Sequence, residues 1–181
     1  MLDDATLKAL AEFPEKLKAF YDAVPADRKD WAPEFWDGVP SETLTAIEQI
    51  CHVRDIEIDG YHSRFERTLR KVNPVLESLD TYELAKERNY TDANAEEVLS
   101  AFRQARLKTV QLLSSLSADE LSRTAVFDGY GSVTLRSLVH YLCSHDQQHL
   151  SGLQWLLGKI EAERSRSVLV MQTRHADSSS V

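Results

Sequence analysis

The segment that decides the fold is LRSLVHYLCSHDQQHLSGLQWLLGK, which runs from Leu135 to Lys159. Its apolar residues recur every three or four positions, which is the period of an α-helix with one buried face. Two histidines, His145 and His149, fall on the same apolar stripe. Their spacing of four residues places both imidazoles on one face about a single turn apart. The stripe therefore predicts a core helix that carries two polar side chains into the interior.

Three further segments show the same helical period: about 14–23, from Ser41 to about Lys71, and a helix capped by Asn94. Glu42 is then expected in the first turn of the second helix. The chain has only 6 Gly and 5 Pro, and the stretches between them lack the alternation typical of strands. The less periodic stretch 74–93 is expected to cross from one end of the molecule to the other. The sequence thus predicts an all-α four-helix bundle with a longer crossover connection.

A turn at 128–131 is expected to precede the last helix, which Ser132 or Thr134 opens and which ends near Lys159. We expect one bundle domain over residues 1–160, followed by a polar C-terminal tail, 161–181, that is loosely ordered. The apolar share of 43% is sufficient for one core.

The net charge of -8 argues against a surface that binds nucleic acid or anionic lipid. No apolar run approaches the roughly 20 residues of a membrane span, and the opening lacks the pattern of a secretory signal. We therefore expect a cytoplasmic protein with no nucleic-acid or membrane partner. Its expected partners are a small-molecule substrate and a second copy of the chain in a homodimer.

The two core histidines leave two interpretations open. Adjacent buried imidazoles are costly unless they are hydrogen-bonded to each other or bind a metal such as zinc. Two cysteines are too few for a CxxC zinc site, so a metal would rely mainly on histidines and carboxylates. The residues alone do not fix a third ligand, because His52 falls to the side of the second helix's stripe and the period favours Cys51. His62 and His140 are expected at the surface.

Two short motifs resemble the DinB superfamily. The residues H-V-R-D-I-E that start at His52 resemble its H-[LV]-x-D-x-E stretch, and H-D-Q-Q-H at 145–149 resembles its H-x-x-x-H pair. The resemblance spans about 14–160. Members of this family, which includes bacillithiol-transferase-like proteins, are four-helix bundles that bind a divalent metal, commonly zinc or nickel. The resemblance implies that His52, His145 and His149 are the metal ligands.

Three histidine ligands leave a further position for water or substrate, which is typical of a catalytic site. One chemistry is hydrolysis by water that the metal activates; the other is transfer of a low-molecular-weight thiol to an electrophile. The family includes thiol-dependent transferases and isomerases as well as proteins described as metal-dependent hydrolases. Thiol transfer ranks first, because no carboxylate on the last helix's stripe is aimed as a general base. The non-catalytic alternative is a metal-binding protein with a stress-response role.

Three residues are candidates for substrate binding. Arg54 and Arg106 occupy positions where apolar residues are expected, so each either pairs with an interior carboxylate or anchors an anionic substrate. Asp55 and Glu57 are expected to point elsewhere around the helix, which leaves donor capacity on Arg54. Tyr141, one turn before the first histidine of the last helix, either reaches the metal cavity or packs with its hydroxyl in water.

Overall fold

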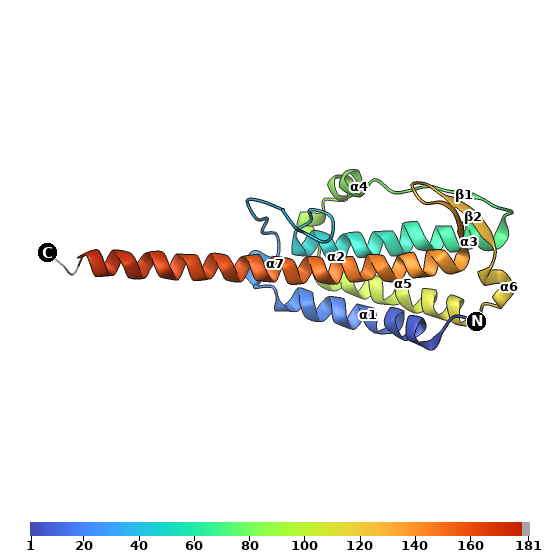
Figure 1. The fold of residues 1–181 in the computed structure, drawn as a ribbon, viewed down its shortest axis with the longest axis horizontal. Coiled ribbons are helices and arrows are strands. Elements are labelled where there is room, and N and C mark those ends of the chain that lie inside the picture. The colour runs from blue at the N-terminus through green and yellow to red at the C-terminus, as the bar shows by residue number, and fades with distance from the viewer. Residues whose placement is uncertain (179–181) are drawn as a thin grey trace.

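The computed structural model describes residues 1–178, with side chains described through residue 166, and shows an elongated helical bundle (Figure 1). Its long segments are α1 (Asp4–Ala23), the continuous run of α2 (Ala46–Asp55), the π-helix η2 (Ile56–Tyr61) and α3 (His62–Arg70), then α5 (Ala95–Ser115) and α7 (Leu135–Ser178). The short helices are η1 (Ala26–Arg28), α4 (Thr81–Glu87), η3 (Tyr90–Asp92) and α6 (Ala118–Leu121). The predicted four-helix bundle is confirmed.

The helices are connected in an order that places α2 beside α7. α1 packs against α5 and α7, and α2 packs against the same two helices. α2–α3 and α5 run in the same direction (Figure 1), so the chain must return along the bundle between them. The predicted crossover makes this return through α4 and η3.

Local chemistry sets the helix ends. Asn94 caps α5 as predicted, since its side chain accepts from the backbone N–H groups of the first turn. The predicted start of the second helix at Ser41 is wrong. Thr45 and Glu48 form a capping box there, with the Thr45 N–H donating to Glu48 at 2.8 Å. Glu42 therefore lies in the loop before α2 rather than in its first turn.

A three-stranded sheet, which the all-α prediction did not include, covers the bundle where α3 ends (Figure 1). Its strands are β1 (Val75–Leu76), β2 (Thr124–Phe127) and β3 (Gly131–Thr134), with β1 parallel and β3 antiparallel to β2. The predicted turn at 128–131 joins β2 to β3, and Gly129 and Gly131 adopt positive φ there. Ser132 and Thr134 therefore belong to a strand. Strands of two to four residues are too short for their period to be detected in a sequence.

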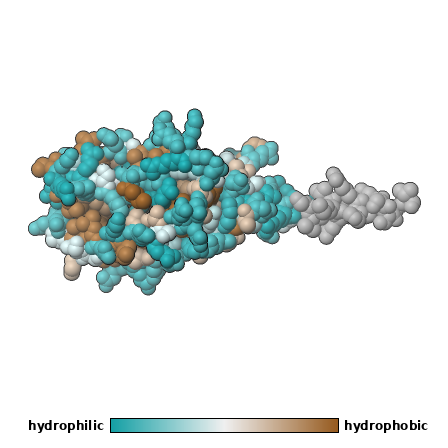
Figure 2. Space-filling view, turned by 180° about the vertical axis from the view of Figure 1, so that it is seen from behind, coloured by the Kyte–Doolittle hydropathy of each residue, from teal (hydrophilic) through white to brown (hydrophobic). Residues whose placement is uncertain are grey.

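The last helix does not end near Lys159 but continues to Ser178 and extends beyond the bundle (Figure 1). No Gly or Pro follows Gly158, so nothing in the sequence stops the helix. The predicted tail is therefore helical over 161–178, and residues 179–181 lie outside the described part of the chain. Seen from behind, hydrophobic residues gather at the opposite end of the bundle (Figure 2). Within the described residues, no helix has an apolar stretch long enough to cross a membrane.

The interior consists of two hydrophobic clusters with a polar layer between them. The cluster under the sheet includes Leu10, Phe65, Leu76, Leu113, Phe127 and Leu138. The cluster at the other end includes Phe13, Leu17, Ile50, Phe102, Leu153 and Leu156. Burial of these side chains drives the packing of the helices. The polar residues between the clusters therefore have to find their partners inside the bundle.

Arg106 on α5 occupies this polar layer and joins four segments. The residue is 1% exposed, and all five N–H groups of its guanidinium have acceptors at 2.7–3.3 Å. Two bonds go to Glu57 on η2, two to Asp146 on α7 and one to the carbonyl of Leu10 on α1. Because a buried charge without partners is costly, these bonds fix how the segments are rotated against one another.

We expect Arg106→Met to lower the free energy of unfolding by about 3–5 kcal/mol, because it leaves Glu57 and Asp146 as unpaired buried carboxylates. Arg103→Met is the matched control on the same helix. The ion pair of Arg103 with Glu15 is exposed, so its loss should change stability by less than about 1 kcal/mol. Urea denaturation measures both variants. Similar small losses in the two would show that the buried ion pairs contribute little.

Gly152 allows α7 to lie close to the loop before α2. A Cβ at this position would lie 2.7 Å from Gln49 Nε2 and closer still to Ser41 Oγ, whereas a Cβ at Gly158 would meet open space. We expect Gly152→Ala to destabilise the protein by about 1–3 kcal/mol through overpacking. Gly158→Ala should instead stabilise it by about 0.5–1 kcal/mol, because alanine favours the helix. Chemical denaturation compares the pair, and a neutral Gly152→Ala would contradict the close approach.

Candidate metal centre

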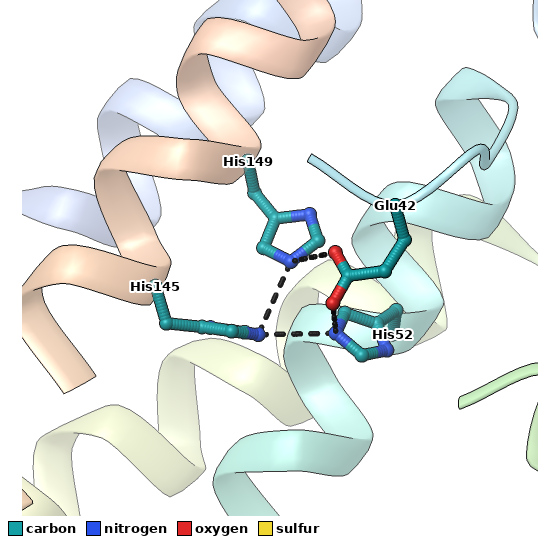
Figure 3. A group of neighbouring side chains, drawn as sticks. All are labelled: Glu42, His52, His145 and His149. Carbon is teal, nitrogen blue, oxygen red and sulfur yellow. Dashed lines mark hydrogen bonds and ion pairs between the residues drawn. The ribbon is translucent and has the colours of Figure 1, made fainter. Parts of the chain in front are cut away.

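Three imidazoles meet where α2 faces α7, and we call His52, His145 and His149 the histidine triad (Figure 3). The Nε2 atom of His145 lies 3.0 Å from that of His52 and 3.1 Å from that of His149. His145 and His149 lie one turn apart on α7, as their spacing predicts. His52 reaches them because α2 contacts α7 on one side and α5 on the other. A position beside the main apolar stripe therefore still faces the interior.

Glu42 adds a carboxylate to the triad from the loop before α2 (Figure 3). Its Oε2 lies 3.3 Å from His149 Nε2, and its Oε1 lies 3.8 Å from His52 Nε2. The side chain is 31% exposed, yet Oε2 is buried and accepts no hydrogen bond from the part of the chain that the structure describes. The carboxylate therefore lies between the interior and solvent, with one oxygen directed at the triad.

Burial keeps the imidazoles neutral. It lowers the pKa of His52 to about 4 and the pKa values of His145 and His149 well below their usual range. The neighbouring imidazoles lower the last two pKa values further. Neutral imidazoles carry the free lone pairs that metal binding requires.

The donor atoms fit a divalent metal. His145 Nε2 contacts the Nε2 atoms of both His52 and His149, and it cannot satisfy both, because neutral imidazole has one N–H and one acceptor nitrogen. The buried Glu42 Oε2 without a partner adds a negative charge to these lone pairs. Donors about 2.0–2.2 Å from a tetrahedral zinc lie about 3.3–3.5 Å apart. The two Nε2–Nε2 separations of 3.0 and 3.1 Å are a few tenths of an ångström below this spacing, so the three imidazoles lie close to the arrangement that one ion requires.

Gln49 orients His149 from one turn further up α2. The Oε1 atom of Gln49 bonds to His149 Nδ1, and its Nε2 donates to Ser41 Oγ at 2.9 Å. Since the amide oxygen accepts, His149 carries its proton on Nδ1 and leaves Nε2 free for a metal. The Nδ1 atoms of His52 and His145 have no hydrogen-bond partner among the described residues. The support for the triad is therefore concentrated on His149.

A cavity of about 370 Å³ opens beside Glu42, His52 and His145. Its wall continues from η2 and α3 to the sheet and α7. The wall residues include Ile56, Tyr61, Arg64, Leu79, Phe127, Tyr130 and Tyr141. The cavity is large enough for a small organic molecule, and its mixed apolar and polar wall is typical of ligand sites.

The three predicted substrate-binding residues lie in three different surroundings, and only one of them lines the cavity. Tyr141 lines the cavity, and its ring packs on Tyr130 with centroids 4.6 Å apart. Arg106 lies in the polar layer with all five N–H groups bonded, which agrees with its interpretation as an internal ion-pair partner. Arg54 does not line the cavity: its Nε and Nη2 donate to Asp55 at 2.6 and 3.0 Å. The expectation that Asp55 points away from Arg54 is wrong, because the long arginine side chain folds back to its neighbour.

Other candidates lie away from the triad. Cys51 is buried in the hydrophobic cluster at the far end, and burial raises the pKa of its thiol to about 12. His140 is exposed, as expected. His62 is half-buried rather than at the surface, with its Nε2 3.0 Å from Thr109 Oγ1 on α5.

No sequence pattern marks Glu42, Gln49 or Arg64 as part of this site. The sequence predicts Glu42 in a helix turn that does not form, and the other two residues carry no motif or spacing signal. Only the packing of α2 against α7 brings Gln49 to His149. A general rule could have drawn attention to the polar Gln49 on a mostly apolar helix face, since buried polar groups need partners.

The chain matches the family model of the DinB superfamily over residues 4–152. Among solved structures it is similar to YfiT from Bacillus subtilis, described as a probable metal-dependent hydrolase with an unusual four-helix bundle topology. The two share 19% sequence identity with a TM-score of 0.76, over 87% of each chain, so this likeness shows the fold. No curated protein sequence matches the chain. Because the family model covers most of the chain, and because the helices of the chain form the expected bundle, the chain belongs to the DinB superfamily.

Proposed function

We propose that this protein is a divalent-metal-dependent enzyme that acts on a small organic molecule. The observation that carries the proposal is the convergence of three neutral Nε2 atoms and one carboxylate beside a cavity. His52, His145 and His149 hold the metal, with zinc or nickel as the expected ion. The similarity to a probable metal-dependent hydrolase supports this class of activity. The cytoplasmic location and the homodimer stay predictions.

The chain's own residues supply the rest of the chemistry. A divalent metal at this position supplies Lewis-acid activation of a nucleophile or of the substrate. Gln49 holds the ring of His149 in one orientation, and the cavity wall surrounds the substrate. Glu42 Oε2 accepts a proton from the attacking nucleophile, since it lies at the triad and has no other hydrogen-bond donor.

Two reactions share this arrangement. In hydrolysis the nucleophile is water, and in thiol transfer it is a low-molecular-weight thiol that attacks an electrophile. The sequence favours thiol transfer because it offers no aimed base. The carboxylate of Glu42 is positioned to accept a proton, so the lack of a base no longer argues against hydrolysis. We therefore place hydrolysis first and keep thiol transfer as the alternative.

Metal binding is tested by single His→Ala variants of the triad. We expect the wild type to hold about one zinc per chain. Each variant should lose most of it, because it removes one of the three imidazoles that hold the ion. His140→Ala is the control, since His140 is exposed on the same helix. Elemental analysis after dialysis measures the stoichiometry, and full zinc content in His52→Ala would remove this residue from the site.

Turnover of an electrophile panel by the metal-loaded protein, with and without added thiols, separates the two reactions. Turnover without thiol indicates a hydrolase, and turnover only with thiol indicates a transferase. Glu42→Gln should lower kcat by about 10²- to 10⁴-fold in either case, because it removes the proton acceptor. Glu48→Gln, in the capping box of α2, is the control for loss of a nearby carboxylate. Metal binding with no turnover across the panel would contradict the proposal and favour a non-catalytic metal-binding role.

A further inference from the structure

Arg64 on α3 is a buried cation without an ion-pair partner. The residue is 6% exposed and lines the same cavity as the triad. Among the described residues, no carboxylate lies within ion-pair distance of its guanidinium, in contrast to Arg106 and Arg54. Burial without such a partner lowers the pKa of Arg64. A guanidinium in this state has unused capacity to bind an anion.

The surroundings of Arg64 hold its guanidinium in place but leave donors free. Gly60 makes room for it, because a Cβ there would lie 3.0 Å from Nη1. The rings of Tyr61 and Phe127 flank it, with Cζ 5.0 and 4.6 Å from their centroids. Nη2 donates to the carbonyl of Glu77 at 3.2 Å, whereas the buried Nε has no acceptor within the described part of the chain. These contacts hold the Arg64 guanidinium in a fixed position, and its hydrogen-bonding capacity is not filled.

The π-helix η2 contributes two of the residues that surround the Arg64 guanidinium. It supplies Gly60 and Tyr61 and lies between the α2 turn that carries His52 and the start of α3. Such π-segments are rare and occur frequently at functional sites. The guanidinium lies at the level of Gly60, eight residues beyond His52, which corresponds to about 12 Å along a helix. The cavity spans this separation, since both Arg64 and His52 line it.

We propose that Arg64 binds the carboxylate of an elongated organic substrate whose reactive group lies at the histidine triad. The proposal rests on the proposed function and names its substrate class. Arg64 is the only Lys or Arg among the described residues that line the cavity. Its single positive charge matches a ligand with a single negative charge. A dianionic phosphate would lack a second cation and would face Glu42 across the cavity. The apolar side chains of Ile56 and Leu79 suit an apolar middle section of the substrate.

The test uses two probes of equal length with a hydroxamate that binds the metal: suberic acid monohydroxamate, which has a distal carboxylate, and uncharged octanohydroxamate. Calorimetry on the zinc-loaded protein should show the carboxylate probe binding about tenfold tighter or more, as expected for a charged hydrogen bond. Arg64→Met should abolish this preference. Arg70→Met, which removes an exposed cation from the same helix, should retain it. Equal binding of both probes to the wild type, or an unchanged preference in Arg64→Met, would overturn the proposal.

A second measurement needs neither metal nor a variant. In metal-free, ¹⁵N-labelled wild type, phenylbutanoate should shift the guanidinium N–H resonances of Arg64, and phenylbutanamide should not, because only the carboxylate offers a charged acceptor. Guanidinium resonances that all stay unmoved by the carboxylate overturn the role of Arg64, even if Arg64→Met fails to fold. If the metal site is absent, both hydroxamates fail to bind while phenylbutanoate still shifts these resonances. The two failures are therefore distinguishable.

Discussion

The buried guanidinium of Arg106 constrains the whole bundle. It lies in the polar layer between two hydrophobic clusters, where each of its N–H groups needs a protein acceptor. Hydrophobic burial is non-directional and tolerates small rotations of a helix, whereas five hydrogen bonds to three other segments do not. Glu57 and Asp146 in turn need the same arginine to balance their charge. The network therefore selects one rotation and one axial position for each helix.

The same network positions the candidate metal centre. Asp146 follows His145 directly, so the rotation of α7 that brings Asp146 to Arg106 also directs the histidine pair toward α2. Glu57 fixes the chain beyond His52 in a similar way. Within the motif that begins at His52, the histidine reaches the site, Asp55 holds Arg54, Arg88 and Tyr90, and the glutamate joins the helices. One short motif thus combines a candidate metal ligand with two groups that hold the bundle together.

The cavity has a different chemistry at each end. Three neutral imidazoles and a carboxylate lie at one end, and an unpaired guanidinium lies toward the other. Neither group is satisfied by the protein around it, since Glu42 Oε2 and Arg64 Nε both lack hydrogen-bond partners in the described structure. An unsatisfied buried group destabilises a fold and needs an explanation, such as an ion or a ligand that completes it. The arrangement favours a metal at the triad and an anion at Arg64, with an apolar section between them.

The sequence by itself determined the helical bundle, the crossover and the histidine pair at 145 and 149, because helical period and cap chemistry are local properties. It did not determine that His52 rather than Cys51 faces the pair; the resemblance implied it, and the packing of α2 between α5 and α7 explains it. The sheet, Glu42 and Arg64 were decided only by tertiary structure. Each depends on contacts between segments distant in the chain, and no local pattern encodes which of several polar side chains meets a partner and which is left without one.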